Sequence, residues 1–195
     1  MRVPKGVLIT LGVLPAVAIF ALLVWALIHD NGENPGGLIV FGSTGEVKIN
    51  QRQAPVFSLT QFDGSQFRSD TLRGKLVMVD FWASWCPPCR AEAKGLETVW
   101  RKYKERGVVF VGVDLWDPDK DSAAAFLKQS GTSYTVGVDL KGGLAVDFGV
   151  TGIPEKYFIS PQGGIIRKFI GPMDEARLSA LLDELLEKVS APAAS

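Results

Sequence analysis

The two cysteines and the residues before them constrain this fold more than any other feature. The chain has only two cysteines, Cys86 and Cys89. They follow Leu76–Ala83, a short apolar run, rich in β-branched residues, that predicts a strand buried on both faces. Apolar residues recur at helical spacing from Pro88 onward, ending before Gly107. The Cys-x-x-Cys motif therefore lies where a strand ends and a helix begins.

This position favours a reactive thiolate. The first sulfur, on Cys86, faces unpaired backbone N–H groups and the positive end of the helix dipole, which stabilise the nucleophilic thiolate. Cys89 lies one turn further along and can close a disulfide with it. Pro87 and Pro88 stiffen the turn, and proline is tolerated in the first turn of a helix. The motif predicts a redox-active dithiol that needs no cofactor beyond the Cys86–Cys89 disulfide.

Three other interpretations of the motif are open. A zinc site of four protein ligands would require two chains to pair, because His29 is the only histidine, so we expect no metal. A structural disulfide closing so small a loop would constrain little of the unfolded chain. A peroxidase of the peroxiredoxin type would require a threonine three residues before its reactive cysteine. The residue three positions before Cys86 is Ala83.

The N-terminus carries a run of 22 residues without a charge, Val7–Ile28. As a helix it would span about 33 Å, which matches a hydrocarbon core of about 30 Å. Arg2 and Lys5 precede the run and acidic residues follow it, which predicts a cytoplasmic N-terminus. A cleaved signal peptide is the alternative, but its apolar core is usually only about 7–15 residues long. We expect an uncleaved, single-pass anchor in the plasma membrane, with the catalytic domain on the extracytoplasmic, periplasmic face.

Composition and patterning then divide the chain into parts. We expect a cytoplasmic stub and anchor at 1–29, a Gly-, Asn- and Pro-rich linker at 30–46, a folded domain at 47–190 and a flexible tail at 191–195. The 21 basic and 21 acidic residues cancel, so we expect no nucleic-acid partner.

Within the folded domain the patterns alternate between strands and helices. In order, they predict a hairpin from Ala54–Leu59 to Gln66–Arg68, a strand at Leu76–Ala83, a helix from Pro88 to about Arg106, a strand at Val108–Asp114, a helix at Asp119–Gln129, a strand at Thr135–Val138, a helix at Gly143–Phe148, a hairpin of Lys156–Ser160 and Ile165–Ile170, and a helix at Glu175–Val189. This order predicts an α/β sandwich with a mixed central sheet flanked by helices.

Several segments of this sequence resemble those of a known protein family. The segment Val79–Arg90, containing Trp-Cys-Pro-Pro-Cys, is similar to the active site of the thioredoxin superfamily. The stretch Gln53–Leu186 resembles the membrane-anchored, extracytoplasmic TlpA-like branch. The loop Gly149–Glu155 resembles that of the cytochrome c maturation thioredoxins, the CcmG/DsbE group. The resemblance implies a thioredoxin fold behind an N-terminal transmembrane helix.

The resemblance also implies roles for individual residues. Cys86 would be the attacking thiolate and Cys89 the resolving thiol, because the exposed sulfur must meet the substrate first. Pro154 would be a cis-proline beside the disulfide, although most X–Pro bonds are trans. It would leave the backbone of Ile153 free to pair with an extended substrate. The other residues expected to face the substrate are Trp85, Pro87 and Pro88.

Three acids are candidate tuning residues. Asp80 stands alone in an apolar strand, where an unpaired carboxyl would have a raised pKa. By resemblance it would accept the proton of the second cysteine, although the TlpA-like branch often has Asn there, and the alternative is an Asp that only finds hydrogen-bond donors. Glu92 lies on the same helix side as Cys89, and Glu155 follows Pro154. Both would raise thiol pKa and favour the reducing direction, unless they are solvated surface acids.

The resemblance implies an activity, a substrate and a donor. The activity is the reduction of apocytochrome c, whose Cys-x-x-Cys-His cysteines must be free thiols before haem attachment. Electrons would come from a membrane donor of the CcdA/DsbD type. One alternative is a general extracytoplasmic reductase for other disulfide-bearing envelope proteins, such as those of copper-site assembly. Another is a non-enzymatic module that binds haem or apocytochrome, which would need no intact dithiol.

Overall fold

The computed structural model describes residues 18–22, 25, 45–47, 49 and 52–190. The chain divides into two compact units, Met1–Val40 and Phe41–Ser195. In the first unit the described residues are helical and exposed. Among the residues that the structure describes, no helix has the length and apolar character needed to cross a membrane. The rest of the expected anchor, the expected linker before residue 45 and the expected tail at 191–195 lie outside the described residues.

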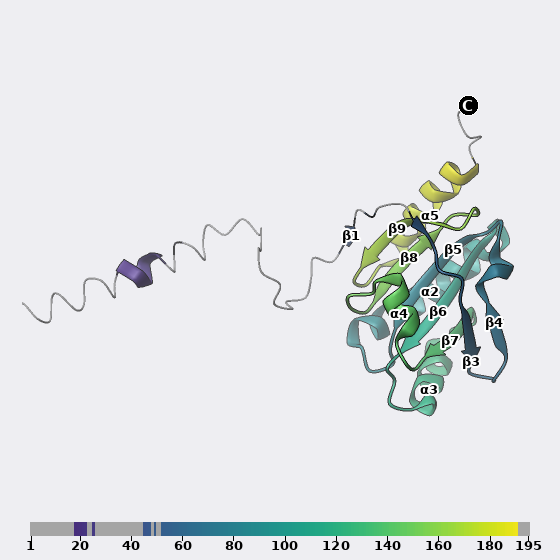
Figure 1. Cartoon of the computed structure of the whole chain (residues 1–195), viewed down its shortest axis with the longest axis horizontal. Helices are drawn as coiled ribbons and strands as arrows, with labels where there is room; N and C mark the ends of the chain where they lie inside the picture. Colours follow the sequence, from purple (N-terminus) through teal and green to yellow (C-terminus); the bar gives the residue numbers. More distant parts are fainter. Residues whose placement is uncertain (1–17, 23–24, 26–44, 48, 50–51, 191–195) are drawn as a thin grey trace, which may run out of the picture. The chain divides into compact units, whose positions relative to one another are not determined.

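The second unit is built on one mixed sheet, as the sequence predicts (Figure 1). Strand β5 is parallel to β6, and β6 to β7, whereas every other described pairing is antiparallel. Across the sheet the strands are β1 (Gly45–Val47), β9 (Gly164–Ile170), β8 (Glu155–Ile159), β5 (Leu76–Trp82), β6 (Val108–Leu115), β7 (Thr135–Asp139), β3 (Ser58–Gln61) and β4 (Gln66–Arg68), with β2 (Arg52–Gln53) also pairing with β9.

Helices cover both faces of this sheet. Along β5, alternate side chains point to opposite faces. Leu76, Met78 and Trp82 pack in one apolar core with α2 (Pro87–Tyr103), α3 (Lys120–Ser130) and α5 (Glu175–Ser190). Val77, Val79 and Phe81 pack in a second core with α4 (Gly143–Phe148). The central strand β5 is therefore buried on both sides, and its carboxyl end leads directly into the motif.

Local signals set the helix ends close to where the sequence places them. Asp119 caps α3, because its side chain accepts a hydrogen bond of 2.6 Å from the Ser122 backbone N–H. Gly131 ends that helix in the left-handed conformation, with φ of 74°. The helix expected up to Arg106 divides into α2 and a final 3₁₀ turn, Lys104–Arg106.

Two boundaries differ from expectation. Gly45 and Glu46, which we expected in the linker, pair with Ile170 and Phe169, so the sheet begins two residues earlier than predicted. The first hairpin strand begins at Ser58 rather than at Ala54. The backbone N–H of Ala54 instead bonds to Gly163 O at 2.9 Å, so Ala54 lies beside the β8–β9 turn, next to β2, before the chain reaches β3 on the other side of the sheet.

Candidate active site

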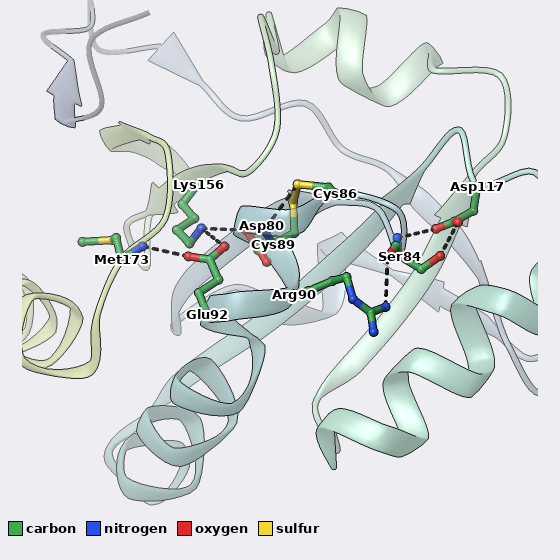
Figure 2. The surroundings of a disulfide bond; sticks show 9 residues. All are labelled: Asp80, Ser84, Cys86, Cys89, Arg90, Glu92, Asp117, Lys156 and Met173. Atoms are coloured by element: carbon green, nitrogen blue, oxygen red, sulfur yellow. Dashed lines mark hydrogen bonds and ion pairs between the residues drawn. A yellow bond between two sulfur atoms is a disulfide. The ribbon is translucent and has the colours of Figure 1, made fainter. Parts of the chain in front are cut away.

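The two cysteines lie at the start of α2, as the sequence predicts. Cys86 is the N-cap residue of that helix, and its sulfur accepts a hydrogen bond of 3.3 Å from the Cys89 backbone N–H. The two residues form a disulfide, with their Cα atoms 5.3 Å apart (Figure 2). The structure therefore describes the oxidised form of a dithiol whose first sulfur faces the helix N-terminus.

Exposure does not distinguish the two cysteines in this form. Each is only 3% exposed, so Cys86 is not the more accessible one, contrary to our expectation. What sets Cys86 apart is the N-cap position. The rim of the site is more open, because Trp85 is 53% exposed and the residues between the cysteines, Pro87 and Pro88, are exposed.

The proline loop agrees with the prediction. The Ile153–Pro154 peptide bond is cis. Pro154 is buried, whereas Ile153 is partly buried and packs against the core that contains both cysteines. Ile153 also packs against the second core, so it contacts both apolar clusters.

The loop after β6 adds a residue that the sequence analysis missed. Trp116 is 52% exposed, and its carbonyl accepts a hydrogen bond of 3.3 Å from Trp85 Nε1. Its φ of 56° is uncommon for a bulky residue. Gly142, in the loop before α4, lies so close that a Cβ there would be 3.0 Å from the Trp116 indole nitrogen. No periodic pattern marks Trp116, because it lies in a loop.

The same loop is hydrogen-bonded to the segment before Cys86. Asp117 accepts two hydrogen bonds from Ser84, one from the backbone N–H at 2.7 Å and one from Oγ, and Arg90 donates to Ser84 O at 3.1 Å (Figure 2). Asp114, 1% exposed, stands beside this contact. Burial, together with the hydrogen bond and the charge of Asp117, raises the pKa of Asp114 to about 8.

Behind the disulfide lies a buried cluster of three charged side chains, Asp80, Glu92 and Lys156. Lys156 Nζ donates a hydrogen bond of 2.6 Å to Glu92 Oε1 and lies 3.1 Å from Asp80 Oδ1 (Figure 2). The approach to Asp80 is an ion pair without hydrogen-bond geometry, since Oδ1 accepts no hydrogen bond from the part of the chain described. Glu92 Oε2 accepts a further bond of 2.7 Å from the Met173 backbone N–H.

Strand register explains why this cluster forms. Asp80 on β5 and Lys156 on β8 are direct partners across the antiparallel ladder. Asp80 points to the face covered by α2, because it alternates with Val79 and Phe81. Glu92 comes from α2 itself, one turn after Cys89. Asp80 is thus not the unpaired acid that we expected, and Glu92 is not a solvated surface acid.

Burial and neighbouring charges have opposite effects on the pKa values of Glu92 and Lys156. Burial raises the pKa of Glu92 to about 7, although the charge of Lys156 lowers it. Burial lowers the pKa of Lys156, but the attraction of Asp80 and Glu92 outweighs it, so that pKa lies above its ordinary value. The ammonium is therefore stable in the interior only because it has two carboxylate partners.

Glu155 lies on the other face of the sheet. It alternates with Lys156 along β8, so its side chain points toward Tyr157 and away from α2. It is fully buried, and Lys168 Nζ lies 2.7 Å from its Oε1. Its Oε2 accepts a hydrogen bond from Thr151 Oγ1 at 3.0 Å. The structure thus gives Glu155 a neutralised charge that holds the proline loop, not the negative charge beside the disulfide that we expected.

Lys156 is the functional candidate that the sequence analysis passed over. It was the first residue of an expected strand, where a lysine suggests an exposed end. A signal was nevertheless present, because Lys156 shares its strand face with Phe158, and a lone charge in an otherwise apolar strand needs a partner.

Comparisons with known proteins agree with this geometry. Residues 51–168 match the model of the AhpC/TSA family, which is more than half of the chain. The thiol:disulfide interchange protein HelX of Rhodobacter capsulatus is 36% identical over 119 residues, covering 60% of this chain and 65% of HelX, just under two thirds. The thiol:disulfide interchange protein DsbE of Allochromatium vinosum is 36% identical over 175 residues, covering 87% of this chain and 86% of DsbE.

A solved structure supports the same assignment. The thioredoxin-family thiol:disulfide interchange protein of Chlorobium tepidum TLS superposes with a TM-score of 0.65 at 29% identity, covering 72% of this chain and 99% of that one. The chain therefore belongs to the AhpC/TSA family of thioredoxin-fold proteins, in its branch of DsbE-like thiol-disulfide oxidoreductases.

Proposed function

We propose that this protein is a membrane-anchored reductase of protein disulfides outside the cytoplasm, with apocytochrome c as its main substrate. The observation that carries the proposal is the Cys86–Cys89 disulfide at the N-cap of α2, with the carboxylates of Asp80 and Glu92 buried behind it. The likeness to DsbE and HelX, both named thiol:disulfide interchange proteins, supports the exchange chemistry.

The reaction runs through a mixed disulfide. In the reduced enzyme the Cys86 thiolate attacks one sulfur of the substrate disulfide, and the other substrate sulfur leaves as a thiolate that takes a proton from water. Cys89 then loses its proton and attacks Cys86 Sγ. The enzyme disulfide forms, and the second substrate sulfur leaves. Two electrons pass from the enzyme dithiol to the substrate, and no further cofactor is required.

The buried charges favour the reducing direction. The cluster behind the disulfide holds two carboxylates and one ammonium, so its net charge is negative when both carboxyls are ionised. A negative charge near the sulfurs raises thiol pKa and opposes the thiolate, which makes the disulfide the favoured state of the enzyme. The helix dipole at Cys86 acts in the opposite direction and keeps the attacking sulfur reactive.

Substrate would dock on the rim around the disulfide. Trp85, Trp116 and Ile153 supply apolar surface there, and the exposed Pro87 and Pro88 lie between the cysteines. Since disulfides form by default outside the cytoplasm, the enzyme needs electrons delivered across the membrane. We propose a membrane donor of the CcdA/DsbD type for this supply, and the apolar run Val7–Ile28 as the anchor that keeps the enzyme beside it.

A competition assay tests the function. Reduced full-length protein is mixed with an apocytochrome c peptide whose Cys-x-x-Cys-His cysteines form a disulfide. Native, disulfide-bonded insulin is present at an equal concentration. We expect the peptide to be reduced first, and C86S to reduce neither. Equal rates would support a general envelope-protein reductase instead. Reduction by C86S would contradict dithiol catalysis, and cytochrome c maturation in cells that persists with the C86S/C89S double variant would support a binding module.

A further inference from the structure

A tight turn leads from β5 into the attacking cysteine. The Cys86 backbone N–H donates a hydrogen bond of 3.2 Å to Ala83 O, so Ser84 and Trp85 occupy the central positions of the turn. Cys86 then begins α2 as its N-cap residue, and Trp85 belongs to the exposed apolar rim. The turn therefore sets how the attacking sulfur lies relative to the surface on which substrate would dock.

Hydrogen bonds from other segments hold both central residues of this turn. Asp117 accepts from the Ser84 backbone N–H at 2.7 Å and from Ser84 Oγ (Figure 2). Arg90 on α2 donates to the Ser84 carbonyl at 3.1 Å. On the second central residue, Trp85 Nε1 donates to Trp116 O at 3.3 Å. Because Asp117 makes two of these bonds, its orientation has the largest effect on the turn.

Asp117 is itself held by a second buried acid, Asp114, near the end of β6. The two side chains are hydrogen-bonded to each other, and Asp114 is 1% exposed. Two carboxyl groups can share a hydrogen bond only if one of them carries the proton. Both Asp117 oxygens accept bonds from Ser84, so Asp114 is the donor. Asp114 Oδ1 receives no hydrogen bond from the described chain, which a neutral carboxyl tolerates far better than a buried carboxylate does.

We propose that neutral Asp114 is a positioning residue for the attack by Cys86, acting through Asp117. Its carboxyl proton bonds to Asp117 and keeps that carboxylate on Ser84, so the turn presents the attacking sulfur to a docked substrate. When Asp114 loses its proton to water, two buried carboxylates face each other, and their repulsion draws Asp117 away from the Ser84 N–H. This inference rests on the proposed function, because it concerns the first attack on the substrate disulfide.

The side chains around Asp114 keep the proton on it near neutral pH. Its ladder partners, Trp82 on β5 and Val138 on β7, are apolar. On the helix side, Phe126 of α3 packs against Trp82 with ring centroids 5.5 Å apart. Burial, together with the hydrogen bond and the charge of Asp117, raises the pKa of Asp114 to about 8. Asp114 is therefore neutral at pH 7 and ionises as the pH rises through about 8.

The other charged groups at this end of the sheet have partners of their own or are exposed. Arg90 on α2 bonds to Ser84 O and lies over the Phe126 ring, 4.7 Å from its centroid. Asp139, at the end of β7, accepts from backbone N–H groups of α4. The charged residues at the start of α3 are exposed: Asp119, Lys120 and Asp121. Asp117 is therefore the acid whose contact with Ser84 responds when Asp114 ionises.

Two amide variants separate this positioning role from a direct effect of charge. D114N places an amide donor against Asp117, which then stays on Ser84 at every pH. D117N reverses the pair, because its amide donates to an ionised Asp114 while its carbonyl oxygen can still accept from the Ser84 N–H. The Asp114 charge is thus absent from one variant and permanent in the other, whereas the hold on Ser84 persists in both. D121N, at an exposed position on α3, is the control.

The Ser84 backbone N–H reports the hold itself. Full-length protein carrying 15N-labelled serine is reduced in detergent, and its amide signals are followed by NMR from pH 6.5 to pH 9.5, with S84A identifying the Ser84 signal. In wild type and D121N we expect this signal to shift with a midpoint at about pH 8. In D114N and D117N it should not shift through that range. An unshifted signal in wild type, or the same shift in either amide variant, would overturn the proposal.

Two rates of Cys86 then test whether the hold affects the attack. One is formation of the mixed disulfide with the oxidised apocytochrome c peptide, which needs the turn in place. The other is alkylation by iodoacetamide, a small reagent that does not dock. Both reactions require the thiolate, so the ratio of their rates at one pH cancels the thiolate fraction. Mass spectrometry of acid-quenched samples measures both rates.

At pH 7 we expect the same ratio in all four proteins. At pH 9.5 the ratio should fall about threefold or more in wild type and D121N, roughly the effect of one lost hydrogen bond, and stay unchanged in D114N and D117N. A ratio already low in D117N at pH 7 would show that the Asp114 charge acts directly, and an equal fall in all four proteins would show that the pair has no role. Either result would overturn the proposal. A wild-type protein that forms no mixed disulfide at pH 7 would instead contradict the proposed function, and the Ser84 signal would still test the hold.

Discussion

Asp117 holds Ser84 by two hydrogen bonds, one to the backbone N–H at 2.7 Å and one to Oγ. Both residues are buried, and they lie 33 positions apart in the chain. The contact joins the loop after β6 to the segment that leads into Cys86. The position of the nucleophile therefore depends on a residue outside the strand–helix unit that carries it.

Removing this contact should loosen the active-site segment. In D117A the Ser84 N–H loses its partner, and an unsatisfied buried donor costs about 1–3 kcal/mol of the free energy of unfolding. S84A is the matched control, because it loses only the Oγ bond, at about 0.5–1.5 kcal/mol. Urea unfolding of the oxidised proteins measures both. Equal losses in the two variants would show that the backbone bond contributes nothing.

The buried Asp114 should make stability depend on pH. Its pKa is raised from 3.8 to about 8 in the folded protein, so between these values the folded state holds a proton that the unfolded state has released. Stability from this group therefore falls as the pH rises through that window. In D114N the amide donates to Asp117 without titrating, so D114N should gain stability relative to wild type from pH 5 to pH 9.

Urea unfolding at pH 5, 7 and 9 measures this difference. D147N, an exposed position on α4, is the control and should follow wild type at every pH. A constant difference between D114N and wild type across the three pH values would contradict the raised pKa.

Replacing Cys86 and replacing Cys89 should have different effects on the mixed disulfide with substrate. C89S keeps the attacking sulfur but has no resolving thiol, so it should accumulate the mixed disulfide with substrate. C86S should form none, because Cys89 lies inside the helix and lines a small cavity beside Asp80 and Tyr134. Non-reducing gels and mass spectrometry distinguish these outcomes. Accumulation in C86S rather than in C89S would reverse the assigned roles.

Truncating Trp116 should weaken the binding of peptide and protein substrates but not of small disulfides. Truncating an aromatic contact at an interface commonly costs more than about 1 kcal/mol, roughly a fivefold change. We expect W116A to raise the KM for the apocytochrome c peptide about fivefold, while its rate with a small aromatic disulfide stays at the wild-type value. W116F should restore the peptide KM. Val56→Ala, an exposed apolar residue before β3, is the control. Equal losses with both substrates would indicate a damaged site instead.

Much of the fold was predictable because local pattern and tertiary structure agree here. Leu76–Trp82 is apolar except for Asp80 and is buried throughout, and α4 occupies the predicted residues. Cys86 could be placed because a strand and a helix meet at the motif. Its disulfide partner followed from the absence of any other cysteine.

The charge cluster could not be predicted, because it depends on strand register. Asp80 and Lys156 are 76 residues apart, and only the pairing of β5 with β8 sets them side by side. The same alternation separates Glu155 from Lys156, although the two are adjacent in sequence. Trp116 was missed for another reason, because it lies in a loop and its proximity to Trp85 and Gly142 is not encoded by any local pattern.

The reduction potential of the Cys86–Cys89 couple tests the central claim most directly. It is measured on the full-length protein in detergent by equilibration with glutathione and dithiothreitol mixtures at pH 7. A reductant should fall below about −200 mV, toward the value of about −270 mV for thioredoxin. A potential near about −120 mV, the value of the oxidant DsbA, would mean that this protein donates disulfides, and it would contradict the reduction of apocytochrome c.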